Sequence, residues 1–163
     1  MKFILDDAQL SLVRDGLVLY ALFIGIPTIV VAAGVRSLAR RQGVSASARV
    51  PLLALCGALA ISLATLSWTP GPSREYAPAQ VIISGLLTVV LLAWAVIGKP
   101  SIWRSVAVWW AVIVGYTMGW SVIAAGTDVT GLWGVGLLIL TVSLAVGLGV
   151  IAVIAHIVGV RRG

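Results

Sequence analysis

The segment RSLARRQGVSASAR, residues 36–49, is the only place in the sequence where charge clusters. It holds Arg36, Arg40, Arg41 and Arg49, and it separates two long apolar runs that contain no charged residue. If those runs cross a lipid bilayer, the segment stays in the cytoplasm, because positively charged loops between membrane spans are retained there. It then fixes the orientation of every other segment, and its four guanidinium groups are candidates for contact with anionic lipid headgroups.

The composition is that of a membrane protein. Of the 163 residues, 61% are hydrophobic and 10% are charged, and the mean hydropathy is +1.14. Soluble domains contain about 45–50% apolar and about 25% charged residues. We therefore predict an all-α, polytopic transmembrane helix bundle that forms a single integral membrane domain over residues 1–163.

Five apolar runs are long enough to cross a hydrocarbon core of roughly 30 Å. Segments rich in proline and glycine separate them, such as TPGPSREYAP at 69–78 and the tripeptide GKP at 98–100. The predicted spans are about 16–35, 51–68, 79–97, 102–125 and 132–160. The last run corresponds to about 44 Å of helix, so it tilts, extends past the membrane or breaks into two half-helices.

Pro27 lies near the middle of the first predicted span. A proline removes one backbone donor and crowds the carbonyl four residues before it, so we expect a kink at this position. In transporters such a break can mark a binding site, which makes Pro27 a candidate functional residue. The pattern favours a structural kink, because one proline in one helix is all that points to transport.

Small residues recur every four positions in two of the predicted spans. Small side chains let helix backbones approach closely, which is how membrane helices pack when the lipid is as apolar as they are. We interpret these residues as candidates for helix packing. They are Ala54, Ala58 and Ser62, with Ala60 and Ala64 at the same spacing, and the GxxxG pair Gly115 and Gly119.

The distribution of basic residues predicts the orientation of the chain. With residues 36–49 in the cytoplasm, eight basic residues lie on that side and three, Lys2, Arg14 and Arg74, lie outside. We therefore expect the N-terminus outside and the C-terminus inside, in the cytoplasmic (inner) membrane of a prokaryote. The cytoplasmic set is Arg36, Arg40, Arg41, Arg49, Lys99, Arg104, Arg161 and Arg162.

The sequence holds no residue set typical of catalysis, of a metal site or of a cofactor site. No acidic or basic residue lies in the middle of a span, and the only histidine, His156, falls near the inner end of the last span. One histidine cannot complete a zinc site, a pair of haem ligands or a catalytic triad. The pattern favours a non-enzymatic protein without a cofactor. It also favours an interfacial or helix-contact role for His156 over a ligand or proton-relay role completed by another subunit.

Hydroxyl side chains are the remaining candidates for a polar path through the membrane, and Tyr116 is the largest of them. Such hydroxyls more often bond the backbone of their own helix or a neighbouring helix. The candidates are Ser62, Thr65, Ser84, Thr88, Tyr116, Thr117, Thr141 and Ser143.

Two functions are consistent with this pattern. The one we favour is a small non-catalytic integral membrane subunit or scaffold that packs against partner membrane helices in a larger complex. The alternative is a homo-oligomeric transporter or channel for a small solute or ion, in which Pro27, Tyr116 and His156 take part. A lipid-modifying enzyme would lack catalytic acids and bases. The expected partners are a bilayer with anionic headgroups and other membrane subunits or further copies of the chain, whereas nucleic acid is not expected because the basic residues lie beside apolar runs.

Overall fold

The structure, a computed structural model, describes residues 18, 20–41, 47–67, 76–97, 101–127 and 132–162. Every regular element in these ranges is helical, which confirms the all-α prediction for this part of the chain. Four of the helices are long and apolar enough to cross a membrane, as in a multi-pass membrane protein. These are α3 (Arg49–Leu66), α4 (Pro78–Ile97), α5 (Ile102–Thr127) and α6 (Trp133–Arg162); they follow a π-helical turn, η1 (Ala21–Gly25), and α2 (Ile26–Arg41).

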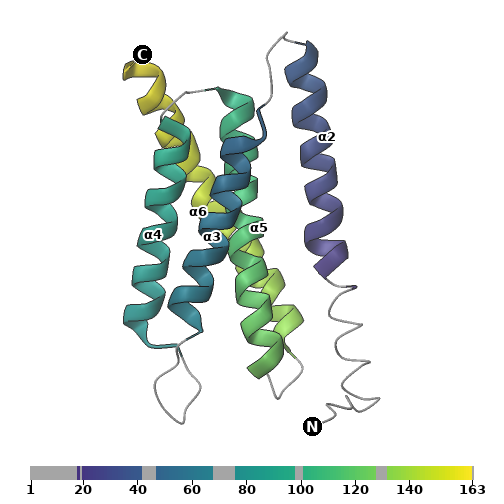
Figure 1. Ribbon diagram of the computed structural model, residues 1–163, viewed down its shortest axis with the longest axis vertical. Coiled ribbons are helices and arrows are strands. Elements are labelled where there is room, and N and C mark those ends of the chain that lie inside the picture. Colours follow the sequence, from purple (N-terminus) through teal and green to yellow (C-terminus); the bar gives the residue numbers. More distant parts are fainter. Residues whose placement is uncertain are drawn as a thin grey trace.

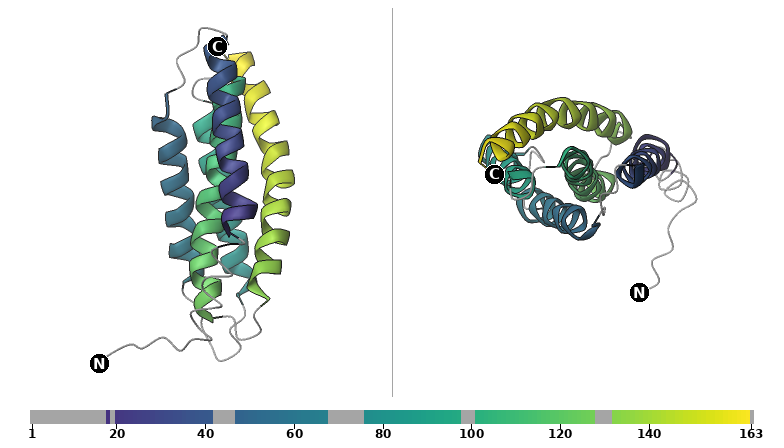
Figure 2. Two further views of the ribbon diagram at one scale, coloured as in Figure 1. Left: turned by 90° about the vertical axis from the view of Figure 1, so that its right-hand side faces the viewer. Right: turned by 90° about the horizontal axis from the view of Figure 1, so that it is seen from above.

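Consecutive helices from α2 to α6 run in alternating directions along one axis (Figure 1). Seen down that axis, α5 lies in the middle, with α3, α4 and α6 around one side and α2 on the other (Figure 2). Helix α5 contacts each of the other four, and α2 packs mainly on α5. The bundle is therefore organised around α5, and α2 is its least embedded helix.

The sequence of α5 explains its central position. All seven residues from 111 to 117 are buried, which is two helical turns without a lipid-facing side. The outer helices instead bury one stripe, such as Ser84, Thr88 and Leu92 on α4, and expose the rest. A helix that is buried all round belongs in the interior of a bundle.

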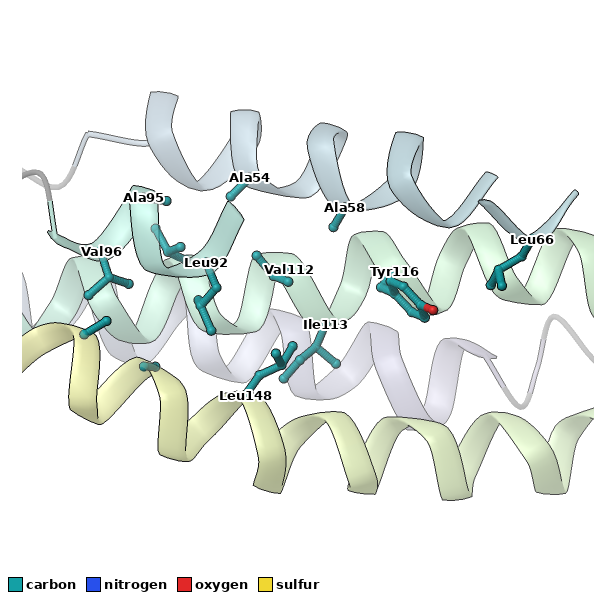
Figure 3. Packing of buried hydrophobic residues seen from close by; sticks show 13 residues of the cluster. Ala54, Ala58, Leu66, Leu92, Ala95, Val96, Val112, Ile113, Tyr116 and Leu148 are labelled. Carbon is teal, nitrogen blue, oxygen red and sulfur yellow. The ribbon is translucent and has the colours of Figure 1, made fainter. Parts of the chain in front are cut away.

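The core forms where small residues of α3 meet larger ones of α4 and α5, and it continues to Leu148 of α6 beside Ile113 of α5 (Figure 3). Ala54 and Ala58 are fully buried and point from α3 toward Leu92 on α4 and Val112 on α5 (Figure 3). Methyl side chains on α3 keep its axis close to α5, while the branched side chains of the partner helices fill the space between the layers.

The helix is irregular next to Pro27, where the sequence predicts a kink. The turn before it is π-helical, and the Ile26 N–H bonds the Ala21 carbonyl five residues back. Pro27 has no N–H and cannot continue an ordinary α-helical ladder across this point, so the wider turn absorbs the mismatch. Regular α-helix then begins at Ile26, with Pro27 in its first turn, where a missing donor costs least.

The basic segment is not a loop throughout, because the helix continues past residue 35, where the predicted membrane span ends. Helix α2 continues to Arg41, so Arg36, Arg40 and Arg41 are helical, and Arg49 is the first residue of α3. Arginine, leucine and alanine are strong helix formers, and basic residues in a last turn interact favourably with the helix dipole. The charged residues mark the predicted edge of the membrane span but not the end of the helix.

The last apolar run is one continuous helix. Helix α6 has 30 residues, about 45 Å at 1.5 Å per residue, and shows no break into half-helices. It curves around the bundle and crosses it obliquely (Figure 2). Of the three alternatives for its length, the break into two half-helices is therefore excluded, and tilt or extension past the membrane remains.

Candidate functional site

The closest helix pair joins the GxxxG motif of α5 to α3. A Cβ built on Gly115 would overlap the backbone carbonyl oxygen of Leu55, and one built on Gly119 would overlap the Ser62 hydroxyl and lie 3.2 Å from the Leu59 carbonyl. Any larger residue at Gly115 therefore forces the two backbones apart. The structure thus places the GxxxG motif against another helix of the same chain.

The small residues of α3 fall on two different faces. Ala54, Ala58 and Ser62 are fully buried in the face toward α4 and α5. Cys56, Ala60 and Ala64, which follow the same four-residue spacing, are exposed, and we call them the outer α3 stripe. The described helices of the chain leave this stripe uncovered. Its side chains are small enough for another helix backbone to approach closely.

Tyr116 makes a buried polar contact between two helices in the core. Its hydroxyl shares a 2.8 Å hydrogen bond with the Ser84 hydroxyl of α4, and both residues are buried. Such a bond between neutral groups satisfies both hydroxyls away from water and fixes the relative rotation of α4 and α5. Tyr116 therefore acts in this structure as a contact between helices.

Four further buried hydroxyls bond the carbonyl four residues back in their own helix. This holds for Thr88, Thr117, Ser121 and Thr141, at distances of 2.7–2.8 Å. Hydroxyls bonded in this way offer little to a passing solute. In the described part of the chain, these hydrogen bonds therefore favour a structural role for the hydroxyl groups over a continuous polar path through the bundle.

His156 joins α6 to α5 close to the basic end of the bundle. Its Nδ1 lies 3.2 Å from the Ser105 hydroxyl, with which it shares a hydrogen bond. The residue before Ser105 also joins two helices, because the Arg104 guanidinium donates to the Ala95 carbonyl in the last turn of α4. Among the described residues, no three His, Cys, Asp or Glu side chains lie close enough to share a metal ion.

Three polar side chains that the sequence analysis did not single out hold the helices in place. The Trp110 indole donates to the Thr28 hydroxyl of α2, at 2.9 Å, and the Trp109 indole donates to the Ala145 carbonyl of α6, at 3.2 Å. No spacing rule predicts either pairing.

The third side chain, Gln80, could have been found from the sequence. Pro78 at the first helical position and glutamine two residues later resemble half of a capping box. Its side chain accepts from the Ala77 N–H and donates to the Thr65 carbonyl.

Basic side chains gather at one end of the bundle. The C-terminal ends of α2, α4 and α6 and the N-terminal ends of α3 and α5 meet there (Figure 1). The described residues include no carboxylate side chain, since all five acids of the sequence lie in other segments. The described arginines at or near these helix ends are Arg36, Arg40, Arg41, Arg49, Arg104 and Arg161.

No known protein family, no curated protein and no solved structure matches this chain.

Proposed function

We propose that this protein is a non-catalytic integral membrane subunit that crosses the bilayer five times and packs against the helices of a partner protein. The observation that carries the proposal is the outer α3 stripe of Cys56, Ala60 and Ala64, an exposed small-residue face in a helix long and apolar enough to span a membrane. Small-residue faces are where membrane helices associate, because close backbone approach supplies the van der Waals contact that drives packing. The same spacing on the opposite side of α3 already serves contacts within the chain.

The proposed orientation has the N-terminus outside, the C-terminus inside and the basic end of the bundle in the cytoplasm of a prokaryotic inner membrane. Supporting it, the described arginines gather at one end, as retention of positive charge in the cytoplasm requires. Supporting a fifth span, the helical run from Ala21 to Arg41 is roughly 30 Å long, which matches the hydrocarbon core.

The test is co-purification from native membranes in a mild detergent, using the variant Ala60→Leu. A leucine on the outer α3 stripe holds the partner helix away, and overpacking of this kind costs about 1–3 kcal/mol. We expect association to weaken about 5- to 150-fold, so that a defined partner recovered with the wild type is lost. The matched control is Ala33→Leu, which adds the same side chain to an exposed position on α2 and should leave recovery unchanged.

Recovery of the partner with Ala60→Leu at the wild-type level would refute the assignment of this face. Self-association, as the alternative homo-oligomeric transporter or channel requires, has its own signature. Two copies packed through the stripe bring their Cys56 thiols together, and oxidation of the membranes then yields a disulfide-linked dimer.

A further inference from the structure

A groove lies between α2, α3 and α5, and we call it the α2 groove. Its volume is about 240 Å³. Thr28 and Arg36 line it from α2, Leu52 and Leu55 line it from α3, and Val114 lines it from α5. Thr28 and Arg36 are eight residues apart on one helix, so the groove extends about 12 Å from the basic end toward the middle of the bundle.

The lining of the groove is almost wholly apolar. Ala111 and Val114 form a buried floor, whereas Leu52 on the rim is 58% exposed, so the groove opens to the side of the bundle. At its deep end the polar atoms are already satisfied, because the Trp110 indole donates to the Thr28 hydroxyl. The exposed polar side chains of the lining lie at the other end of the groove. They are Arg36 and Ser47.

Positive charge is concentrated at that polar end. Arg36 lines the groove itself, Arg40 and Arg41 follow on the next turns of α2, and Arg49 opens α3. No described residue offers a carboxylate to these guanidinium groups. Guanidinium groups match phosphate oxygens in charge and geometry, and basic residues at the cytoplasmic surface attract anionic lipids.

We propose that the α2 groove binds an anionic glycerophospholipid, with one acyl chain along the apolar floor and the phosphate beside Arg36. The groove is smaller than the enclosed pockets of about 300–1,000 Å³ that hold drug-sized molecules, and its open side suits a chain that stays partly in the bilayer. The lipid fills the space between α2 and α3 and ties the least embedded helix to the bundle. This inference rests on the proposed orientation, which puts the basic end of the bundle at a membrane surface, and does not depend on the subunit proposal.

The experiment measures lipid binding to the full-length protein in detergent by native mass spectrometry. Dioleoylphosphatidylglycerol and dioleoylphosphatidylcholine, which share their acyl chains and differ in net charge, are the probes. We expect the wild type to retain the anionic lipid preferentially, and Arg36→Gln to lose about fivefold in affinity for it, the share of one arginine at a charged membrane surface. Ala32→Phe fills the groove from an exposed lining position, and we expect it to weaken binding although every arginine remains.

Arg161→Gln is the matched control, because it removes an exposed arginine from the same end of the bundle but away from the groove. An equal loss with Arg36→Gln and Arg161→Gln would show diffuse surface attraction and overturn the proposal. Unchanged binding in Ala32→Phe would overturn it as well, since the chain would then lie elsewhere. Displacement of the lipid by inorganic phosphate alone would mean that charge is bound without the acyl chain, which also contradicts the groove.

Discussion

Replacing Gly115 with alanine destabilises the protein by about 3 kcal/mol, at the upper end of what overpacking usually costs. The new methyl group would overlap the Leu55 carbonyl oxygen, and a backbone atom in the middle of α3 cannot rotate away as a side chain can. Relief requires the two most intimately packed helices of the bundle to separate. A loss of this size is a large part of the roughly 5–15 kcal/mol that holds a typical protein together. Unfolding by titration with a denaturing detergent measures it directly.

Two further glycine variants separate this effect from a general intolerance of glycine replacement. A Cβ added at Gly147 on α6 would meet no atom within 4 Å, so Gly147→Ala should change the free energy of unfolding by less than about 1 kcal/mol. Gly119→Ala meets the Ser62 hydroxyl, a side-chain atom, so the second change Ser62→Ala should restore part of the lost stability. Equal stabilities for Gly115→Ala and Gly147→Ala would rule out the contact between α3 and α5.

A quadruple variant without the basic segment's charge inserts into the membrane in two orientations. Its changes are Arg36→Gln, Arg40→Gln, Arg41→Gln and Arg49→Gln. In the proposed topology the cytoplasmic side holds eight basic residues and the outer side three, and the quadruple variant leaves four against three. Because orientation follows the asymmetry of lysine and arginine in short loops, so small a difference no longer selects one insertion mode. We expect a single orientation for the wild type and a mixture for the variant.

Labelling of engineered cysteines by a membrane-impermeant maleimide reads out this result. Glu75→Cys and Gly163→Cys, each in a Cys56→Ser background, report the two sides of the membrane. Asp6→Asn combined with Asp7→Asn serves as the control, since acidic residues contribute little to orientation. Labelling of position 163 from outside in the otherwise wild-type protein would reverse the proposed topology.

The apolar runs of the sequence located the helices well, because length and hydrophobicity are what a bilayer demands of a span. Four of the five predicted spans correspond to helices that meet the membrane criteria. The helical part of the basic segment was not predicted, because its charge suggested a loop. Arg36, Arg40 and Arg41 are nevertheless good helix formers. The π-helical turn at Ala21–Gly25 was missed because a proline predicts a disruption without predicting its form.

Which face of each helix turns inward could not be read from the sequence. In a soluble protein the polar face of a helix identifies its outer side. Here lipid and core are equally apolar, so the hydrophobic periodicity does not distinguish the inward face from the outward face. The second predicted span carries Ala54, Ala58 and Ser62 at the same spacing as Ala60 and Ala64, and only the tertiary structure shows that the first set is buried and the second exposed. The α2 groove is equally invisible, because it depends on how far α2 stands from α3.

If the outer α3 stripe faces a partner helix, a photocrosslinker placed beside that stripe reacts with the partner. Leu53 lies next to the stripe and is 61% exposed, so p-benzoylphenylalanine at position 53 probes what lies there in native membranes. The same group at Val90, which is 63% exposed on α4, is the control for lipid contact. We expect an adduct of defined mass with another membrane polypeptide from position 53 and lipid adducts from position 90. Lipid adducts alone from both positions would contradict it.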